Sequence, residues 1–127
     1  MTKQVSFSKY EQELRREYRQ RINSAESTED VKKFFVRTVT DLFEKALGRK
    51  VEADYEDVHL DPRRKDGFVI SKGVWTIPGF VLAWKTSDLP KIVERMAEFA
   101  IKRHKRLEAH RDKTEAKMYP PPGPRSG

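Results

Sequence analysis

The sequence contains no cysteine, which excludes disulfides, thiolate metal ligands and cysteine nucleophiles. Long apolar runs are absent as well. The longest uncharged stretch, residues 73–84, is too short to span a bilayer and is interrupted by Pro78 and Gly79. The first ten residues lack the apolar run of a signal peptide. From these absences we expect a cytoplasmic protein that makes no contact with a membrane.

The motifs that mark common catalytic and cofactor sites are missing too. The six glycines are scattered, so the sequence has no glycine-rich loop of the kind that binds phosphate groups. No serine stands in the context of a nucleophile elbow. We therefore expect a protein without enzymatic activity, without a cofactor and without a small-molecule substrate.

Charge is what the sequence has in abundance. Charged residues make up 37% of the 127 residues, hydrophobic residues make up 36%, and the formal net charge is +7. Because the apolar residues lie in periodic blocks, they predict a packed core under a charged surface. The length suits one domain, which we expect to span residues 1–112.

Apolar residues at helical spacing predict three helices. The first begins at the capping box Ser8-x-x-Glu11, and the second begins at Ser27 or Thr28 and ends before Gly48, which suits a left-handed C-cap. The predicted helices span about residues 8–23, 28–47 and 88–111.

Between the second and third helices the pattern changes to alternation and short continuous apolar runs, which are typical of strands. The predicted strands span about residues 51–60, 67–77 and 80–85. The fold class is therefore α+β in the order ααβββα, with a three-stranded antiparallel meander packed by helices. Residues 113–127 are rich in proline and are predicted to form a disordered tail.

Basic residues are unevenly distributed along the chain. Residues 85–106 hold seven basic and three acidic side chains, whereas residues 51–61 hold five acidic side chains and no lysine or arginine. A basic helix face predicts contact with a polyanion such as nucleic acid, or with an acidic protein, although it also suits a solvated surface. The candidate contact residues are Arg15, Arg16, Arg19, Lys91, Arg95, Lys102, Lys105 and Arg106.

The main functional prediction is a small, basic, non-catalytic binding or assembly protein. Since no motif of an established nucleic-acid module occurs, binding would be directed at the backbone and would carry little sequence specificity. One alternative is an adaptor subunit that binds a protein through its apolar strands and first helix. The continuous apolar strands also suggest a homodimer, because such strands are usually covered on both faces.

A second alternative is a metal-dependent enzyme. Asp57, His59 and Asp61 are the only tight cluster of metal ligands or acid/base groups in the sequence. On an extended strand their side chains project from one face, as a divalent metal or a proton-transfer pair requires. The basic turn that follows can also neutralise this cluster without any ligand.

Overall fold

Helices make up most of the part of the chain that the computed structural model describes, residues 6–51 and 57–118, with side chains described up to residue 109. The protein is a small domain of mostly helices with a two-stranded antiparallel sheet. The elements are α1 (Ser8–Ser24), α2 (Thr28–Leu47), β1 (Val58–Leu60), β2 (Phe68–Ile70), α3 (Lys72–Trp75), α4 (Phe80–Thr86) and α5 (Leu89–Met118).

Local capping signals explain the bounds of α2. The Ser27 hydroxyl accepts a hydrogen bond from the Asp30 backbone N–H at 3.1 Å, as an N-cap should. At the other end, Gly48 adopts the left-handed conformation (φ +67°) and its N–H donates to the Glu44 carbonyl. The expected range of this helix and both of its caps are confirmed.

The start of α1 differs from the expected capping box. Phe7 is the N-cap and its side chain forms no cap hydrogen bond. The Ser8 backbone N–H donates to Ser6 Oγ at 3.3 Å, and the Phe7 backbone N–H donates to Asp88 Oδ1 at 2.8 Å. Glu11 does not reach back to the helix start, because its carboxylate binds an arginine on α5. Glu11 therefore forms a long-range ion pair and takes no part in capping α1.

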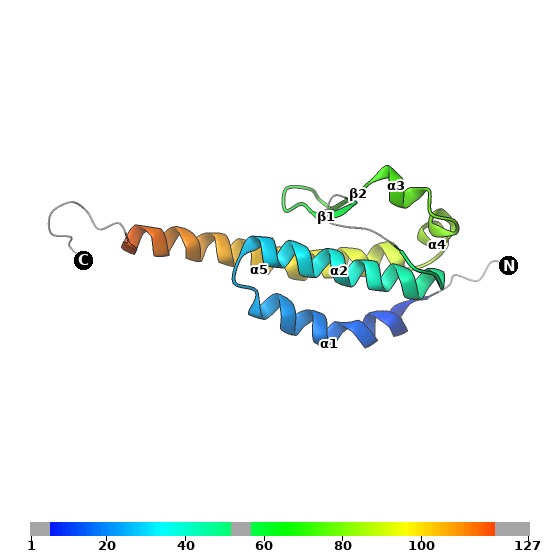
Figure 1. The fold of residues 1–127 in the computed structure, drawn as a ribbon, viewed down its shortest axis with the longest axis horizontal. Helices are drawn as coiled ribbons and strands as arrows, with labels where there is room; N and C mark the ends of the chain where they lie inside the picture. The colour runs from blue at the N-terminus through cyan, green and yellow to red at the C-terminus, as the bar shows by residue number, and fades with distance from the viewer. Residues whose placement is uncertain (1–5, 52–56, 119–127) are drawn as a thin grey trace.

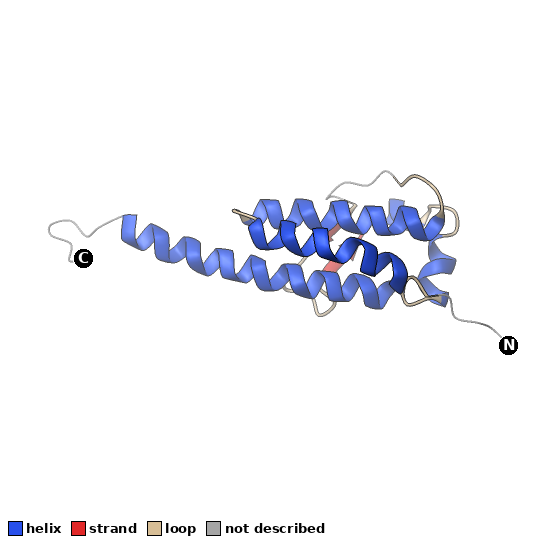
Figure 2. Ribbon diagram, turned by 90° about the horizontal axis from the view of Figure 1, so that it is seen from below, coloured by secondary structure: helices blue, strands red, loops and turns tan. Residues whose placement is uncertain are grey.

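The elements form three layers, with α2 and α5 in the middle (Figure 1). The helix α1 lies over one face of this pair, and the hairpin with α3 and α4 lies over the other face (Figures 1 and 2). Along the layer α1 and α5 run in the same direction and α2 runs in the opposite one. Because α1 contacts α2 more extensively than α5, the side facing α5 is the more open.

The core is centred on α2, which contacts elements of both outer layers. Phe35, Val39, Leu42 and Phe43 are fully buried there. An aromatic cluster joins α2 to α3 and α4 on the hairpin side, where Phe43 and Phe80 meet edge to face with centroids 4.9 Å apart. Burial of such side chains is the main stabilising contribution to the fold.

The sheet is smaller than the three-stranded meander predicted from the sequence. In the described residues β1 and β2 pair with His59 opposite Val69. The expected strand 51–60 is formed at Val58–Leu60, and residues 52–56 lie outside the described part. The expected strand 67–77 ends at Ile70, after which α3 begins.

The prediction of a third strand at 80–85 is wrong, because this run is the helix α4. Gly79 provides the left-handed conformation (φ +86°) that redirects the chain after Pro78. Phe80 and Trp84, four residues apart, then share the face that packs on Phe43. A short continuous apolar run fits a buried strand and a buried helix equally well, so its pattern could not decide between them.

The helix α5 is longer than predicted. It begins at Leu89, close to the expected start, and continues to Met118 beyond the expected end at about residue 111. The first part of the expected tail is therefore helical, which the helix formers Ala, Glu and Lys in this stretch favour. The remaining proline-rich residues lie outside the described part of the chain. Figure 1 shows α5 extending past the ends of α1 and α2.

Candidate functional site

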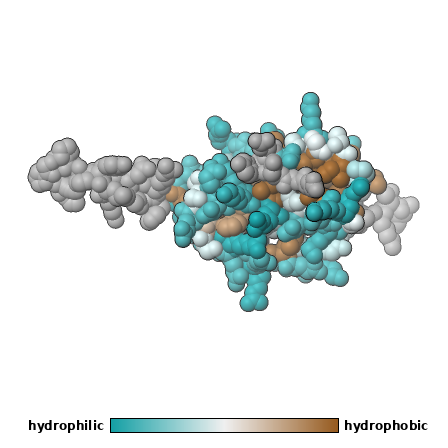
Figure 3. All heavy atoms as spheres, viewed as in Figure 1, coloured by the Kyte–Doolittle hydropathy of each residue, from teal (hydrophilic) through white to brown (hydrophobic). Residues whose placement is uncertain are grey.

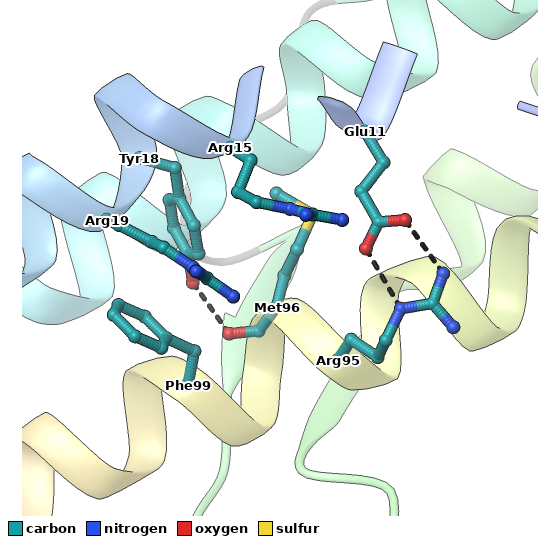
Figure 4. Close-up of a pocket in the computed structure, with 7 residues that line it drawn as sticks. All are labelled: Glu11, Arg15, Tyr18, Arg19, Arg95, Met96 and Phe99. Carbon is teal, nitrogen blue, oxygen red and sulfur yellow. Dashed lines mark hydrogen bonds and ion pairs between the residues drawn. The ribbon is translucent and has the colours of Figure 1, made fainter. Parts of the chain in front are cut away.

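A pocket of about 80 Å³ opens between α1 and α5 on the more open side of α1. Three arginine side chains and one carboxylate surround it, above a floor of apolar and aromatic groups (Figure 4). We call it the α1–α5 pocket. Its lining residues are Glu11, Arg15, Tyr18, Arg19, Arg95, Met96 and Phe99.

Glu11 and Arg95 form the best-defined ion pair at this pocket. The Arg95 Nε and Nη2 atoms donate to Glu11 Oε2 and Oε1 at 2.9 and 2.8 Å, which is the two-pronged geometry of a guanidinium on a carboxylate. Glu11 is 8% exposed, whereas the Arg95 side chain is half-exposed. The hydrogen bonds to Glu11 raise the pKa of Arg95, so its charge is permanent and its position is set by Glu11.

Tyr18 closes the bottom of the pocket. Its hydroxyl donates to the Met96 carbonyl at 2.7 Å, and its ring packs against Phe99 with centroids 6.1 Å apart. Burial raises the pKa of the Tyr18 phenol, so the hydroxyl stays protonated and keeps donating. The hydrogen bond ties α1 to α5 at the middle of their contact.

Arg15 and Arg19 enter the pocket from α1, one helical turn apart. Both are exposed, and Figure 4 shows both guanidinium groups directed to the space above Met96. Arg19 lies over the Phe99 ring at 5.3 Å from its centroid, which is a cation–π contact. Neither arginine forms an ion pair with a described residue. With Arg95 and Glu11 included, the formal charge of the pocket is +2.

The structure places three of the eight predicted polyanion contacts in this pocket, namely Arg15, Arg19 and Arg95. Lys102 and Arg106 are exposed on the same side of α5 as Arg95, at seven and eleven residues further along the helix. Lys102 lies near the end of α1, because its neighbour Arg103 donates to the Ala25 carbonyl there. These side chains form a row that continues from the pocket.

Of the other three predicted contacts, Arg16 and Lys105 lie away from this row, whereas Lys91 lies on the same side of α5 as Arg95. Arg16 is exposed about 200° around α1 from Tyr18 and faces away from α5. Lys105 is exposed on α5 about 120° from Phe99 by the helical repeat. Lys91 is exposed one turn before Arg95 and about 40° from it, so it extends the row on the other side of the pocket. The basic residues predicted as one contact surface therefore occupy several faces of the two helices.

Four lining residues were not among the predicted contacts: Glu11, Tyr18, Met96 and Phe99. In the sequence, Tyr18, Met96 and Phe99 stand at apolar positions with helical spacing, a pattern that indicates packing and not a ligand site. Glu11 carried the signal of a helix cap, and no sequence feature links it to a partner 84 positions away. Only the packing of α1 beside α5 brings these residues together.

The predicted metal cluster is arranged differently from a metal site. Asp57 Oδ1 accepts from the Ser71 hydroxyl at 3.1 Å, and Asp61 Oδ1 accepts from the Arg63 backbone N–H at 3.0 Å. His59 lies between them on β1. Among the residues that the structure describes, which include these three, no group of three or more His, Cys, Asp or Glu side chains is placed to hold a metal ion.

One apolar surface is exposed on α4. Val81 is 39% exposed and Leu82 is 68% exposed, and Figure 3 shows hydrophobic surface at the end of the molecule where α4 lies. Trp75 and Trp84 lie beneath it, partly buried in the aromatic cluster with centroids 5.6 Å apart. This surface is separate from the α1–α5 pocket.

Among the described helices, none has the length and apolar content needed to cross a membrane.

Comparisons of the chain with protein-family models, with curated proteins and with solved structures give no match.

Proposed function

We propose that this protein binds nucleic acid through its phosphate backbone, using the α1–α5 pocket and the row of basic side chains that follows it on α5. The observation that carries the proposal is the convergence of Arg15, Arg19 and Arg95 on one pocket between two helices. Guanidinium groups bind phosphate oxygens with two parallel hydrogen bonds, which suits this residue type to the task.

The weak pairing of Arg15, Arg19 and Lys102 with carboxylates supports binding of an anionic ligand. Arg15 and Arg19 are exposed and have no carboxylate partner among the described residues, so a ligand displaces no ion pair when it binds them. Lys102 is paired only with the exposed Glu98, at 3.8 Å, and a pair of this kind contributes little. The net charge of +7 adds long-range attraction for any polyanion.

The proposed role is binding without catalysis and without a cofactor. Contacts to phosphate fix the position of a protein on a strand but do not read its bases, so we expect weak dependence on sequence. An acidic protein is the other partner that this charge suits. A cytoplasmic location and a homodimer stay predictions.

A second candidate function is assembly with a protein through α4, which the exposure of Leu82 favours. Burial of an apolar side chain does not depend on counterion release, so that kind of binding would change little with salt. The dependence of binding on salt therefore separates the two candidates.

The test of the proposed function is fluorescence anisotropy with labelled single- and double-stranded oligonucleotides at low salt. We expect Arg15→Glu with Arg19→Glu to weaken binding by about tenfold or more, because two phosphate contacts become repulsive. The matched control is Lys33→Glu with Arg37→Glu, two exposed residues one turn apart on α2 that do not line the pocket. Equal effects of the two variants would contradict the proposed site.

A further inference from the structure

The α1–α5 pocket is closed on the side of the core. Its floor is made by Tyr18 and Met96, which are 3% and 6% exposed, and by the ring of Phe99. The two helices form its walls. A phosphate group that enters from outside therefore stops at this floor. A nucleic-acid strand that continued in both directions would have to pass over the opening of the pocket.

The charge of the pocket favours one kind of phosphate. A phosphodiester inside a strand carries a single negative charge, whereas a phosphomonoester carries a charge of about −1.5 to −2 at pH 7. The three arginines and Glu11 give the pocket a formal charge of +2, which matches the monoester. A phosphomonoester also offers three terminal oxygens to the guanidinium groups, one more than a phosphodiester can use.

The donors needed for such a group are present. Arg95 uses two of its five N–H groups on Glu11, which leaves three for a ligand. Arg15 and Arg19 bring their guanidinium groups to the same space from α1. Glu11 holds Arg95 in place, so part of the side-chain ordering that binding requires has already occurred in the free protein.

We propose that the α1–α5 pocket binds the terminal phosphate of a nucleic-acid strand, and that the strand then runs over Lys102 and Arg106. This inference rests on the proposed function and makes it specific to strand ends. The row on α5 favours a strand over an isolated phosphate, because Lys102 and Arg106 continue outward from the pocket along one side of the helix.

The experiment compares oligonucleotides of one sequence that carry a 5′-phosphate, a 3′-phosphate or no terminal phosphate, by fluorescence anisotropy with the full chain. We expect one of the two phosphorylated strands to bind about tenfold more tightly than the unphosphorylated strand, because charge-assisted hydrogen bonds to an extra dianionic group are added. Equal affinity for all three strands would overturn the inference and leave the proposed function standing. Failure of all three strands to bind would overturn both.

Two variants assign the effect to the pocket. Arg15→Ala with Arg19→Ala should remove the preference for the phosphorylated strand. Lys102→Ala with Arg106→Ala should weaken the binding of all three strands by a similar factor and leave the preference for the phosphorylated strand unchanged. If the preference survives the first variant, the terminal phosphate binds elsewhere and the inference is wrong.

Competition separates a strand end from other sources of the same group. Inorganic phosphate, a mononucleotide and a phosphoserine peptide are titrated against the complex with the phosphorylated strand. We expect each to displace it only at concentrations far above the dissociation constant of the strand. Binding of any of them as tight as that of the strand would overturn the assignment to a strand end.

Discussion

At the scale of single residues, the Glu11–Arg95 pair explains most about the pocket. A nearly buried carboxylate is tolerable only when it is hydrogen-bonded and paired, and Arg95 supplies both hydrogen bonds. The pair joins residues that are far apart in the chain, so the sequence showed only a glutamate near a helix start and an arginine on a basic helix. The charges of Glu11 and Arg95 could be predicted from the sequence, but the ion pair between them could not.

The pair also predicts a stability effect. We expect Glu11→Gln to lower the free energy of unfolding by about 1 kcal/mol, since it removes charge-assisted hydrogen bonds whose arginine partner is half-exposed. Thermal unfolding followed by circular dichroism at pH 7 measures the change. The control is Glu13→Gln, whose pair with Lys45 at 3.4 Å is exposed on both sides and should contribute less than about 0.5 kcal/mol. Equal losses in the two variants would show that the Glu11–Arg95 pair contributes no more to stability than an exposed ion pair.

At the scale of elements, α2 is the helix whose bounds its own sequence marks most clearly. The range of α2 could be predicted because its apolar residues keep the helical period from Val31 to Leu47 and because Ser27 and Gly48 mark its ends. The run at 80–84 has no polar residue to reveal its period. Its helical state depends on Phe80 and Trp84 packing on Phe43, and this is a tertiary contact that no local pattern contains.

The two serines at the helix starts offer a test of the capping analysis. We expect Ser27→Ala to destabilise the protein by about 1 kcal/mol, because the Asp30 N–H loses its hydrogen-bond acceptor. Ser8→Ala should change stability little, since among the described residues the Ser8 hydroxyl binds only the exposed Ser6 hydroxyl, at 3.1 Å, and caps no backbone N–H. Urea unfolding of both variants measures the difference. A larger loss for Ser8→Ala would contradict the observed caps.

At the scale of the whole molecule, the proposed function depends on how α1 is placed. The helix covers the middle layer closely on the α2 side and leaves the α1–α5 pocket on the other, where basic residues from two distant segments meet. From the sequence, basic character and a polyanion partner could be proposed, but not that α1 places Arg15 and Arg19 beside Arg95 of α5. In the fold, Arg15, Arg19 and Arg95 line the pocket, Lys91, Lys102 and Arg106 lie on the same side of α5 as Arg95, and Arg16 and Lys105 lie on other faces.

The most direct measurement of the central claim is the affinity for an oligonucleotide over a range of salt concentrations. If Arg15, Arg19, Lys102 and Arg106 each neutralise one phosphate, the logarithm of the association constant should fall against the logarithm of salt with a slope of about −2.8 to −3.6, because each contact contributes roughly −0.7 to −0.9. Binding that is absent even at low salt, or a slope near zero, would contradict the account and direct attention to the apolar surface on α4.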